Sequence, residues 1–463
     1  MAIREILLHF SVLAITCAGL INPVFGLFGY MWFSLARPDS TAWVEGQYPH
    51  SMILAIVTLL GAWRYLPNLS NWMRNPWVVS LLLLQVPMIL SVFNAQNFAL
   101  AWIPYKSFAK YLLISLLIPL FITELKEYRR LMLVVAFSIG LIGFRFGLFG
   151  LRTGGVHITS GLGGFMSDNN TLALAFNMGI PFIWHSRALV HRTWQKAAIH
   201  IAMFTTIIGI LITHSRAGIL ALGLVILLLI FRSKHKLAVL MLAALMSLPG
   251  VYMMADSLAS RMQTLEHVEQ DGSAAARLNY ARIALEVWKE YPVLGVGFGT
   301  LNWTALSEKY LYRSTNLQVV HNNYLQMAVD SGTFALVILL WQIFHGIYWT
   351  GKSARLMKRI RPDLVAYPYA LEGSLAAFAL GSMFMSRTDY DFYYYVVMMV
   401  GAWYTVQQRV VAAHAQATAE AALASPPPTA VPETVTARPQ PGFVPRFRSA
   451  SSPIRTSTRI GGS

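Results

Sequence analysis

Apolar runs long enough to cross a lipid bilayer recur along nearly the whole of this 463-residue chain, and they constrain its fold most. The hydrocarbon layer of a membrane is ~30 Å thick, so a helix that crosses it needs about 20 apolar residues. Only 12% of the residues are charged, whereas soluble domains carry about 25%. A chain of this composition lacks the polar surface to cover itself in water. We therefore predict an all-α polytopic membrane protein.

The hydropathy pattern predicts about twelve crossings. The candidate segments are Ile6–Leu20, Val24–Leu35, Ser51–Trp63, Trp77–Val92, Phe108–Ile122, Leu131–Phe149, Thr171–Trp184, Ala197–Thr213, Ala217–Phe231, Leu237–Met254, Tyr324–Trp349, Tyr367–Met385 and Phe392–Val411. The first two are short and are separated by a few residues around Asn22-Pro23. They form either one broken crossing or two thin helices.

The distribution of basic residues predicts which loops face the cytoplasm. Alternate short loops fall into one set with sixteen Lys and Arg residues and a second set with five. The first comprises Arg64, Arg74, Lys126, Arg129, Arg130, Arg187, Arg192, Lys196, Arg232, Lys234, Lys236, Lys352, Arg355, Lys358, Arg359 and Arg361, and the second Arg37, Lys106, Arg152, Arg216 and Arg387. Cytoplasmic loops carry the excess of positive charge, so the first set is cytoplasmic. This bias accounts for the net charge of +16 without nucleic-acid binding.

These assignments divide the chain into four parts. An N-terminal transmembrane bundle spans 1–254, a large periplasmic loop 255–320, and the C-terminal transmembrane helices 321–411. The tail, 412–463, is rich in Ala, Pro, Ser and Thr without apolar periodicity, so we expect it to be disordered in the cytoplasm. The single cysteine, Cys17, excludes an internal disulfide.

The large outer loop holds one candidate for acid–base chemistry. His321-Asn322-Asn323 precedes a predicted span, and Asn is a good helix N-cap because its side chain accepts a helical N–H. This would place an imidazole at the edge of the membrane, where its ordinary pKa of about 6.5 suits a general base. The alternative is an interfacial histidine that only hydrogen-bonds a headgroup or a loop.

Arginines in the outer loops are candidates for binding an anion. Arg216 lies in the short turn Thr213-His214-Ser215-Arg216-Ala217-Gly218, at membrane level, where a guanidinium is costly unless an anion pairs with it. A guanidinium matches a phosphate bidentately. The alternatives are a headgroup anchor or an ion pair with a carboxylate. Arg277 opens a helical pattern with Ala281, Ala284 and Trp288 on its face, and Arg282 follows; both also fit a solvated helix.

Four further patterns give weaker indications of chemistry. Asp330 lies inside a span on one stripe with Asn323 and Gln326, where it is either functional, paired with an arginine, or protonated and structural. Asp389-Tyr390-Asp391 resembles a metal-binding Asp-x-Asp, but Arg387 is two residues away, and we predict no metal site. The run Tyr390–Tyr395 is typical of an interfacial aromatic belt. Gly295–Gly299 lacks the strand and helix of a dinucleotide loop.

The order of four motifs resembles the O-antigen ligase and polymerase superfamily. They are Ser215-Arg216-Ala217-Gly218 at the start of a span, Arg277, Tyr291-Pro292-x-x-Gly295-x-Gly297, and His321-Asn322 followed by Gly332. The family usually has a second Gly three residues after the first, where this chain has Ala335. The segments Asn22–Leu35 and Ser167–Ala173 resemble the branch of O-glycosylation ligases associated with exosortase A systems.

This resemblance implies a C-type glycosyltransferase-like fold and a ligase of the bacterial inner membrane. Its members transfer a glycan from a polyprenyl diphosphate, such as undecaprenyl diphosphate, to a protein, lipid or polysaccharide acceptor at the periplasmic face. They invert the anomeric centre and use no metal or other cofactor. Carried over, Arg216 and Arg277 hold the diphosphate with help from Arg282, and His321 deprotonates the acceptor. His214, Asn322, Asp330 and Gly332 are supporting residues.

Three other functions compete with the ligase. A polymerase of the same superfamily would extend the glycan on its own carrier, and the motifs do not separate the two. A lipid-linked glycan transporter is disfavoured because no inverted repeat and no pair of broken helices occurs in the two halves. A scaffold for an export complex would need no catalytic groups at all.

Overall fold

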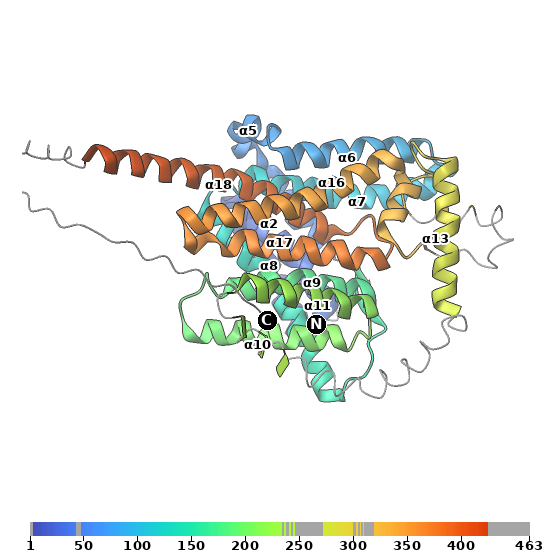
Figure 1. Ribbon diagram of the computed structural model, residues 1–463, viewed down its shortest axis with the longest axis horizontal. Helices are drawn as coiled ribbons and strands as arrows, with labels where there is room; N and C mark the ends of the chain where they lie inside the picture. Colours follow the sequence, from blue (N-terminus) through green and yellow to red (C-terminus); the bar gives the residue numbers. More distant parts are fainter. Residues whose placement is uncertain are drawn as a thin grey trace, which may run out of the picture. The chain divides into compact units, whose positions relative to one another are not determined.

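The computed structural model describes residues 3–42, 48–233, 272–299 and 319–424, with the short pieces 236–237, 240–241, 244–245, 302–303, 306 and 309. Its elements, drawn in Figure 1, are α1 (Ile3–Ile21), α2 (Pro23–Ala36), α3 (Pro38–Ala42), α4 (His50–Gly61), η1 (Ala62–Asn68), α5 (Leu69–Met73), α6 (Pro76–Phe93), α7 (Phe98–Phe121), α8 (Leu125–Thr153), β1 (Ser160–Gly163), β2 (Met166–Asp168), α9 (Asn169–Ser186), α10 (Thr193–Leu211), α11 (Arg216–Arg232), α13 (Gly272–Glu290), α16 (Asn323–Ile360), η3 (Pro362–Leu364), α17 (Ala366–Gly381), η4 (Ser382–Phe384) and α18 (Asp391–Ala424).

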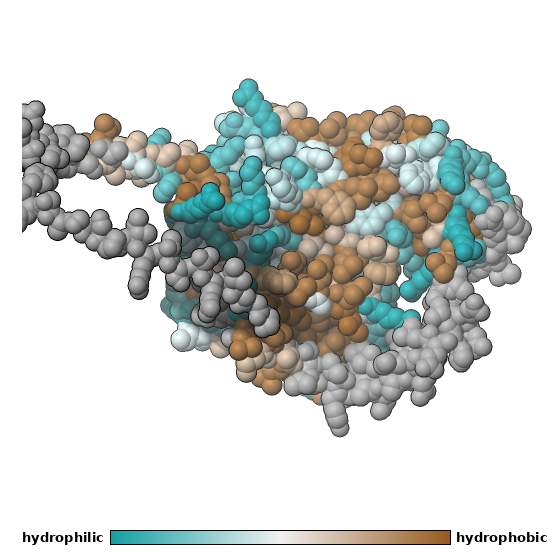
Figure 2. Space-filling view, in the orientation of Figure 1, coloured by the Kyte–Doolittle hydropathy of each residue, from teal (hydrophilic) through white to brown (hydrophobic). Residues whose placement is uncertain are grey.

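Within the described residues, eight helices are long and apolar enough to cross a membrane. In Figure 2, apolar residues cover the middle of the visible face, and polar residues gather toward its left side and over α13 at its right edge. An apolar belt between two polar ends is the surface that a bilayer requires. The all-α polytopic class predicted from the sequence is therefore confirmed.

The first two apolar segments form two helices joined at a single residue. Asn22 caps α2, its side chain accepting a hydrogen bond from the Val24 backbone N–H at 3.0 Å. A Cβ added to Gly19 would lie 3.1 Å from the Gly26 Cα, and one added to Gly29 would lie 2.2 Å from Ile15 Cγ2. These pairings run in opposite directions along the two helices. They make α1 and α2 an antiparallel hairpin rather than one broken crossing.

Several predicted boundaries differ from the structure, and two of them have a clear cause. Helix α7 begins at Phe98, well before Phe108, because the Asn97 side chain caps it by accepting from the Leu100 N–H at 3.2 Å. Helix α18 continues to Ala424, beyond the predicted start of the tail at Ala412, because Ala, Gln and Glu favour helix. Residues 425–463 and most of the predicted span Leu237–Met254 lie outside the described residues. By contacts between Cα atoms the chain divides into Met1–His414 and Ala415–Ser463.

The tyrosine run is a correction to the sequence prediction. Tyr390, Tyr393, Tyr394 and Tyr395 are almost fully buried within the bundle instead of forming a belt at its surface. Their hydroxyl groups reach, in that order, the Thr171 carbonyl, Gln342, the Thr388 carbonyl and Ser34. A buried tyrosine needs such a partner for its hydroxyl. The run therefore packs the start of α18 against its neighbours.

Helix α16 is broken at Gly332, whose φ of 80° and ψ of −177° are not helical. The glycine-rich loop after α13 packs on this break: the Val296 N–H donates to the Val329 carbonyl at 2.8 Å, and the Thr333 N–H to the Pro292 carbonyl at 2.8 Å. A Cβ at Gly332 would lie 2.0 Å from the Val293 oxygen, so only glycine fits. The loop and the break together fix α13 against the start of α16.

Candidate functional site

One polar cavity is lined by the ends of several helices, and of the residues that the sequence analysis assigned to the site its described lining includes His321. Its volume is about 590 Å³. It is lined by Pro104, Ser167–Thr171, Phe298, Gly299, Val319, His321 and Phe384–Asp389. These segments come from α7, the β1–β2 hairpin and the start of α9, the glycine-rich loop, the start of α16 and the link between α17 and α18.

His321 lines this cavity and is held there by the helix cap that the sequence predicted. The Asn322 side chain accepts hydrogen bonds from the Tyr324 and Leu325 backbone N–H groups at 3.0 and 3.1 Å. His321 itself has a φ of 56°, in the left-handed region that non-glycine residues rarely adopt. Such a conformation costs about 1–3 kcal/mol and is maintained only where the surroundings impose it.

The charge of the His321 imidazole is coupled to two side chains. Burial lowers the pKa of His321 below its ordinary value, and the positive charge of Arg277 lowers it further, while Asp168 acts in the opposite direction. The neutral imidazole, which accepts a proton, is therefore favoured. Arg277 is exposed on α13 and is close enough to act on the His321 ring.

Arg216 begins α11, directly after a serine that is hydrogen-bonded to a residue lining the cavity. The hydroxyl of Ser215 caps this helix, accepting from the Gly218 N–H at 3.0 Å, and donates at 2.7 Å to the side-chain oxygen of Asn170, which lines the cavity. A Cβ at Gly218 would lie 2.7 Å from that of Ala173, so glycine allows α11 to approach α9. The Ser-Arg-Ala-Gly motif thus fixes the position of Arg216, whose side chain is exposed.

His214 lies in the turn before Arg216, also with a positive φ of 51°. Its ring stacks on that of His157, with 4.6 Å between the centroids. The Thr213 carbonyl accepts from Asn169 Nδ2 at 3.0 Å, which ties the turn to the start of α9. His214 therefore supports the turn, and it is not among the described residues that line the cavity.

Helix α13 packs on the protein through Tyr280, Ile283, Ala284 and Val287. Of the residues predicted to share a face with Arg277, Ala284 is fully buried, and Ala281 and Trp288 are half-buried. Large apolar side chains select the buried stripe, and Arg277 is left at its edge. Arg282 is exposed, and neither arginine is among the described residues that line the cavity.

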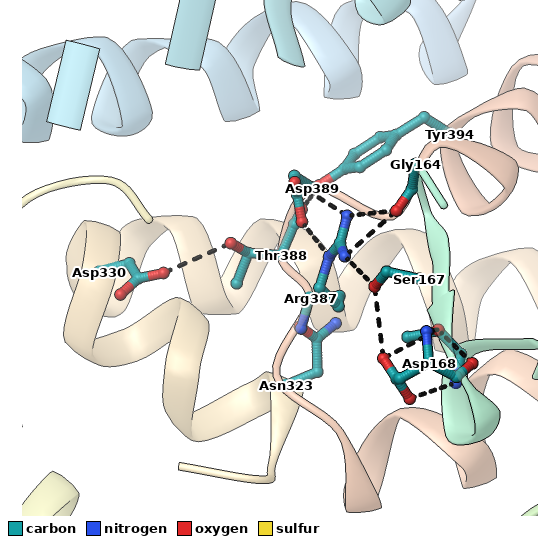
Figure 3. Close-up of polar contacts among 10 residues, drawn as sticks. Gly164, Ser167, Asp168, Asn323, Asp330, Arg387, Thr388, Asp389 and Tyr394 are labelled. Atoms are coloured by element: carbon teal, nitrogen blue, oxygen red, sulfur yellow. Dashed lines mark hydrogen bonds and ion pairs between the residues drawn. The ribbon is translucent and has the colours of Figure 1, made fainter. Parts of the chain in front are cut away.

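Arg387 and Asp389 form a polar wall of the cavity that the sequence analysis did not assign to the site (Figure 3). Arg387 Nε donates to Asp389 Oδ1 at 2.8 Å, and Arg387 Nη1 donates to the Ser167 hydroxyl at 3.2 Å. Burial lowers the pKa of Arg387, but Asp389 outweighs this effect and holds the pKa above its usual value. Both residues were noted in the sequence, but their contacts with the Gly164 turn and Ser167 could not be predicted from it.

Asp168 completes this wall and is the N-cap of α9. Its Oδ1 accepts from the Asn170 and Thr171 N–H groups at 2.8 and 3.1 Å, and the Thr171 hydroxyl closes a capping box. Ser167 Oγ lies 3.5 Å from the other carboxylate oxygen. Asp168 therefore both caps α9 and contributes a carboxylate to the lining of the cavity.

Asp330 is fully buried behind the cavity and pairs with neutral groups. Gln326 Nε2 donates to its Oδ1 at 2.6 Å. The Thr388 hydroxyl donates to its Oδ2 at 3.4 Å, a contact drawn in Figure 3. These two described contacts favour the structural alternative over a pair with arginine. Among the residues that the structure describes, no cluster of three or more His, Cys, Asp and Glu side chains has the arrangement of a metal site.

Comparison with known proteins matches two regions of the chain to family models. Residues 201–340 match the family model described as O-antigen ligase. Residues 3–188 match a second model, described as Family of unknown function (DUF5935). The curated proteins contain no match to the chain. The first match includes the Ser215–Gly218 turn, Arg277, the glycine-rich loop and His321, the motifs that predicted this family. Residues 201–340 of this membrane protein therefore carry a domain of the O-antigen ligase superfamily.

Proposed function

We propose that this protein transfers a glycan from a polyprenyl-diphosphate carrier to an acceptor hydroxyl at the periplasmic face of the inner membrane. The transfer inverts the anomeric centre and needs no metal. The O-antigen ligase domain supports membrane glycosyltransferase activity of the ligase or polymerase type. The carrier, the stereochemistry, the side of the membrane and the residue roles are the finer parts of the proposal.

The observation that carries it is the position of His321 in a polar cavity, with the charge of Arg277 acting on its ring. A neutral imidazole in a cavity of about 590 Å³ has room for a sugar hydroxyl beside it. The proton of that hydroxyl passes to the imidazole as the oxygen attacks the anomeric carbon. General-base catalysis of this kind contributes about 10²–10⁴-fold in rate.

The bond from the anomeric carbon to the diphosphate breaks on the opposite side of the sugar. Negative charge then builds up on the departing diphosphate, and fixed cations lower the energy of that transition state. Arg216 and Arg277 are the proposed cations, with Arg282 further along α13 as an assistant. The two helices that carry them flank the segments lining the cavity: α11 through Ser215 and Asn170, and α13 through the break in α16.

The positions of the basic loops support the periplasmic placement of the cavity. The cavity is formed at the starts of α9, α16 and α18 and the end of α17. The basic segments lie at the other ends of these or neighbouring helices: Lys126–Arg130 begins α8, Arg187–Lys196 joins α9 to α10, and Lys352–Arg361 ends α16. Positive charge favours the cytoplasm, which leaves the cavity for the periplasm.

The test is a reaction of the purified full-length protein in lipid nanodiscs. The donor is an oligosaccharide on polyprenyl diphosphate, and the product is followed by mass spectrometry with and without a chelator. We expect release of polyprenyl diphosphate, a glycan on the acceptor with the inverted linkage, and the same rate with the chelator. Retention of configuration, or loss of the reaction on chelation, would contradict the mechanism.

The same reaction separates ligase from polymerase. A ligase leaves the glycan on a foreign acceptor, whereas a polymerase yields a ladder of longer glycans that stay on the carrier. A ladder without any transfer to protein, lipid or polysaccharide acceptors would keep the chemistry and overturn the ligase assignment.

A further inference from the structure

The polar wall of the cavity, formed by Arg387, Asp389, Asp168 and Ser167, has hydrogen-bonding capacity that its own contacts do not use. Asp389 accepts from Arg387 Nε at 2.8 Å and from Nη2 at 3.3 Å, and no other described residue donates to its carboxylate. A carboxylate has about four acceptor positions. The side chains of Asp389 and Arg387 are 35% and 26% exposed, so a ligand in the cavity can reach them. Ser386 lines the same cavity, and its buried hydroxyl has no hydrogen-bond partner among the described residues.

Contacts from three separate elements hold this wall in position (Figure 3). The Arg387 backbone N–H donates to Asn323 Oδ1 at the start of α16, at 3.2 Å. The Thr388 carbonyl accepts from the Tyr394 hydroxyl of α18 at 2.7 Å, and Arg387 Nη1 donates to the Ser167 hydroxyl of β2 at 3.2 Å. A site that is ordered in advance loses less conformational entropy when its ligand binds.

The charges of the cavity favour a neutral ligand at this wall. Among the described lining residues, two carboxylates, Asp168 and Asp389, face one guanidinium, Arg387, which leaves an excess of one negative charge. Hydroxyl groups donate to carboxylates and accept from a guanidinium, whereas a further carboxylate would be repelled. The same cavity has apolar surface at Pro104 and Phe298, on which the C–H face of a sugar ring can pack. Its volume of about 590 Å³ is typical of small-molecule sites.

The wall lies between the two parts of the proposed reaction. Asp168 acts electrostatically on His321, the proposed base. Asn170, which lines the cavity next to Asp168 in sequence, accepts from the hydroxyl of Ser215, and Ser215 caps the helix that begins with Arg216. If the arginines bind the diphosphate and the imidazole faces the acceptor, the sugar that joins them lies beside the polar wall.

We propose that the polar wall selects the donor by its first sugar, the one joined to the diphosphate. Asp389 and Asp168 accept hydrogen bonds from hydroxyl groups of that sugar, and Arg387 donates to its oxygens. A neutral sugar therefore binds, and a sugar that carries a carboxylate is rejected. This inference rests on the proposed function, because it assigns part of the proposed donor to the wall.

The test measures binding to the full-length protein in lipid nanodiscs by calorimetry at pH 7, without an acceptor. The three probes are farnesyl diphosphate esters that carry glucose, glucuronic acid or, in place of the sugar, a methyl group. We expect the glucose ester to bind about tenfold more tightly than the methyl ester, because it adds hydrogen bonds to charged groups. It should also bind about tenfold more tightly than the glucuronic acid ester, which places like charges together.

Two variants separate the effect of charge from that of fold. Asp389→Asn removes the excess negative charge and should abolish the preference for glucose over glucuronic acid. Arg387→Gln increases that excess and should enlarge the preference severalfold. Both variants break the same ion pair, so damage to the fold would change the preference in the same direction in both.

The matched control is the Arg361–Asp363 pair at the other end of α16. It has the same spacing in sequence, with Arg361 Nε and Nη2 donating to the carboxylate at 2.9 and 2.8 Å, and it is exposed. Asp363→Asn and Arg361→Gln should bind all three probes as the natural protein does.

Equal binding of the glucose and methyl esters, or shifts of the same direction in Asp389→Asn and Arg387→Gln, would overturn this inference. The proposed function fails by a different result, namely binding of the methyl ester that Arg216→Ala and Arg277→Ala leave unchanged. Because that result involves no sugar, each of the two proposals can fail alone. Absence of binding by all three probes would overturn both.

Discussion

The two ends of the helical bundle both carry arginines, but only one end combines them with a strained backbone. At the basic end, Arg187 stacks on Trp184 with 3.2 Å to the ring centroid, Arg232 pairs with Glu372, and Arg361 pairs with Asp363 at 2.8 Å. At the cavity end lie Arg37, His214 and His321, the three described non-glycine residues with positive φ. Positive charge is found at both ends and therefore does not by itself identify the functional site. What distinguishes the cavity end is an arginine near an imidazole whose backbone is strained.

The largest effect should come from the imidazole at the cavity end. We expect His321→Ala to lower glycan transfer by about 10²–10⁴-fold, because the acceptor hydroxyl loses its base. His191→Ala, an exposed histidine at the basic end, should transfer at the wild-type rate. The measurement is the transfer rate in membranes at matched protein level. An active His321→Ala variant would remove the base from the mechanism.

The next largest loss of transfer rate should come from removing the arginines that are proposed to bind the diphosphate. Arg216→Ala and Arg277→Ala are each expected to slow transfer about 10²–10³-fold, as loss of one fixed donor to a developing anion does elsewhere. Arg130→Ala, which removes an exposed arginine at the start of α8, should have little effect. Equal losses at both ends would mean that these arginines act on the bilayer and not on the substrate.

The backbone at the cavity end can be tested separately from its charges. Gly332→Ala places a Cβ 2.0 Å from the Val293 oxygen at a φ of 80°, so we expect a loss of about 3 kcal/mol in unfolding free energy. Gly223→Ala in α11 meets no atom within 4 Å and should be neutral or slightly stabilising. The midpoint of thermal unfolding in detergent compares them. A harmless Gly332→Ala would show that the break in α16 is not required.

The sequence predicted those features of the fold that depend on residues close together along the chain. The apolar spans and the Asn322 cap follow from local sequence pattern, as does the contrast between loops that are rich and loops that are poor in Lys and Arg. The family motifs identified His321 and Arg216 as candidate site residues. The polar wall of Arg387, Asp389 and Ser167 could not be predicted this way, because a hairpin some 220 residues away supplies its partners. The positive φ of His321 was likewise not predicted from the sequence.

The smallest expected effect is a shift in pH dependence. The neutral imidazole is the active form, and its lowered pKa keeps it neutral to lower pH, so transfer should fall on the acid side below the ordinary histidine pKa. Arg277→Gln removes a charge that lowers this pKa and should move the acid limb to higher pH, by less than about one unit. Asp168→Asn removes a charge that raises it and should move the limb the other way.

The pH profile of residual activity gives this comparison, with Arg277→Lys as the variant that keeps the charge. Its acid limb should stay where that of the natural protein lies. Shifts of the same sign in Arg277→Gln and Asp168→Asn would contradict an electrostatic coupling to His321.

The most direct test of the difference between the two ends is the side of the membrane on which each lies. In a Cys17→Ser background, single cysteines at Thr153, exposed at the cavity end of α8, and at His191, exposed in the basic loop after α9, are treated with a membrane-impermeant thiol reagent. The account predicts that right-side-out vesicles label only Thr153→Cys and inside-out vesicles label only His191→Cys. Labelling of both positions from one side, or the reverse pattern, would contradict it.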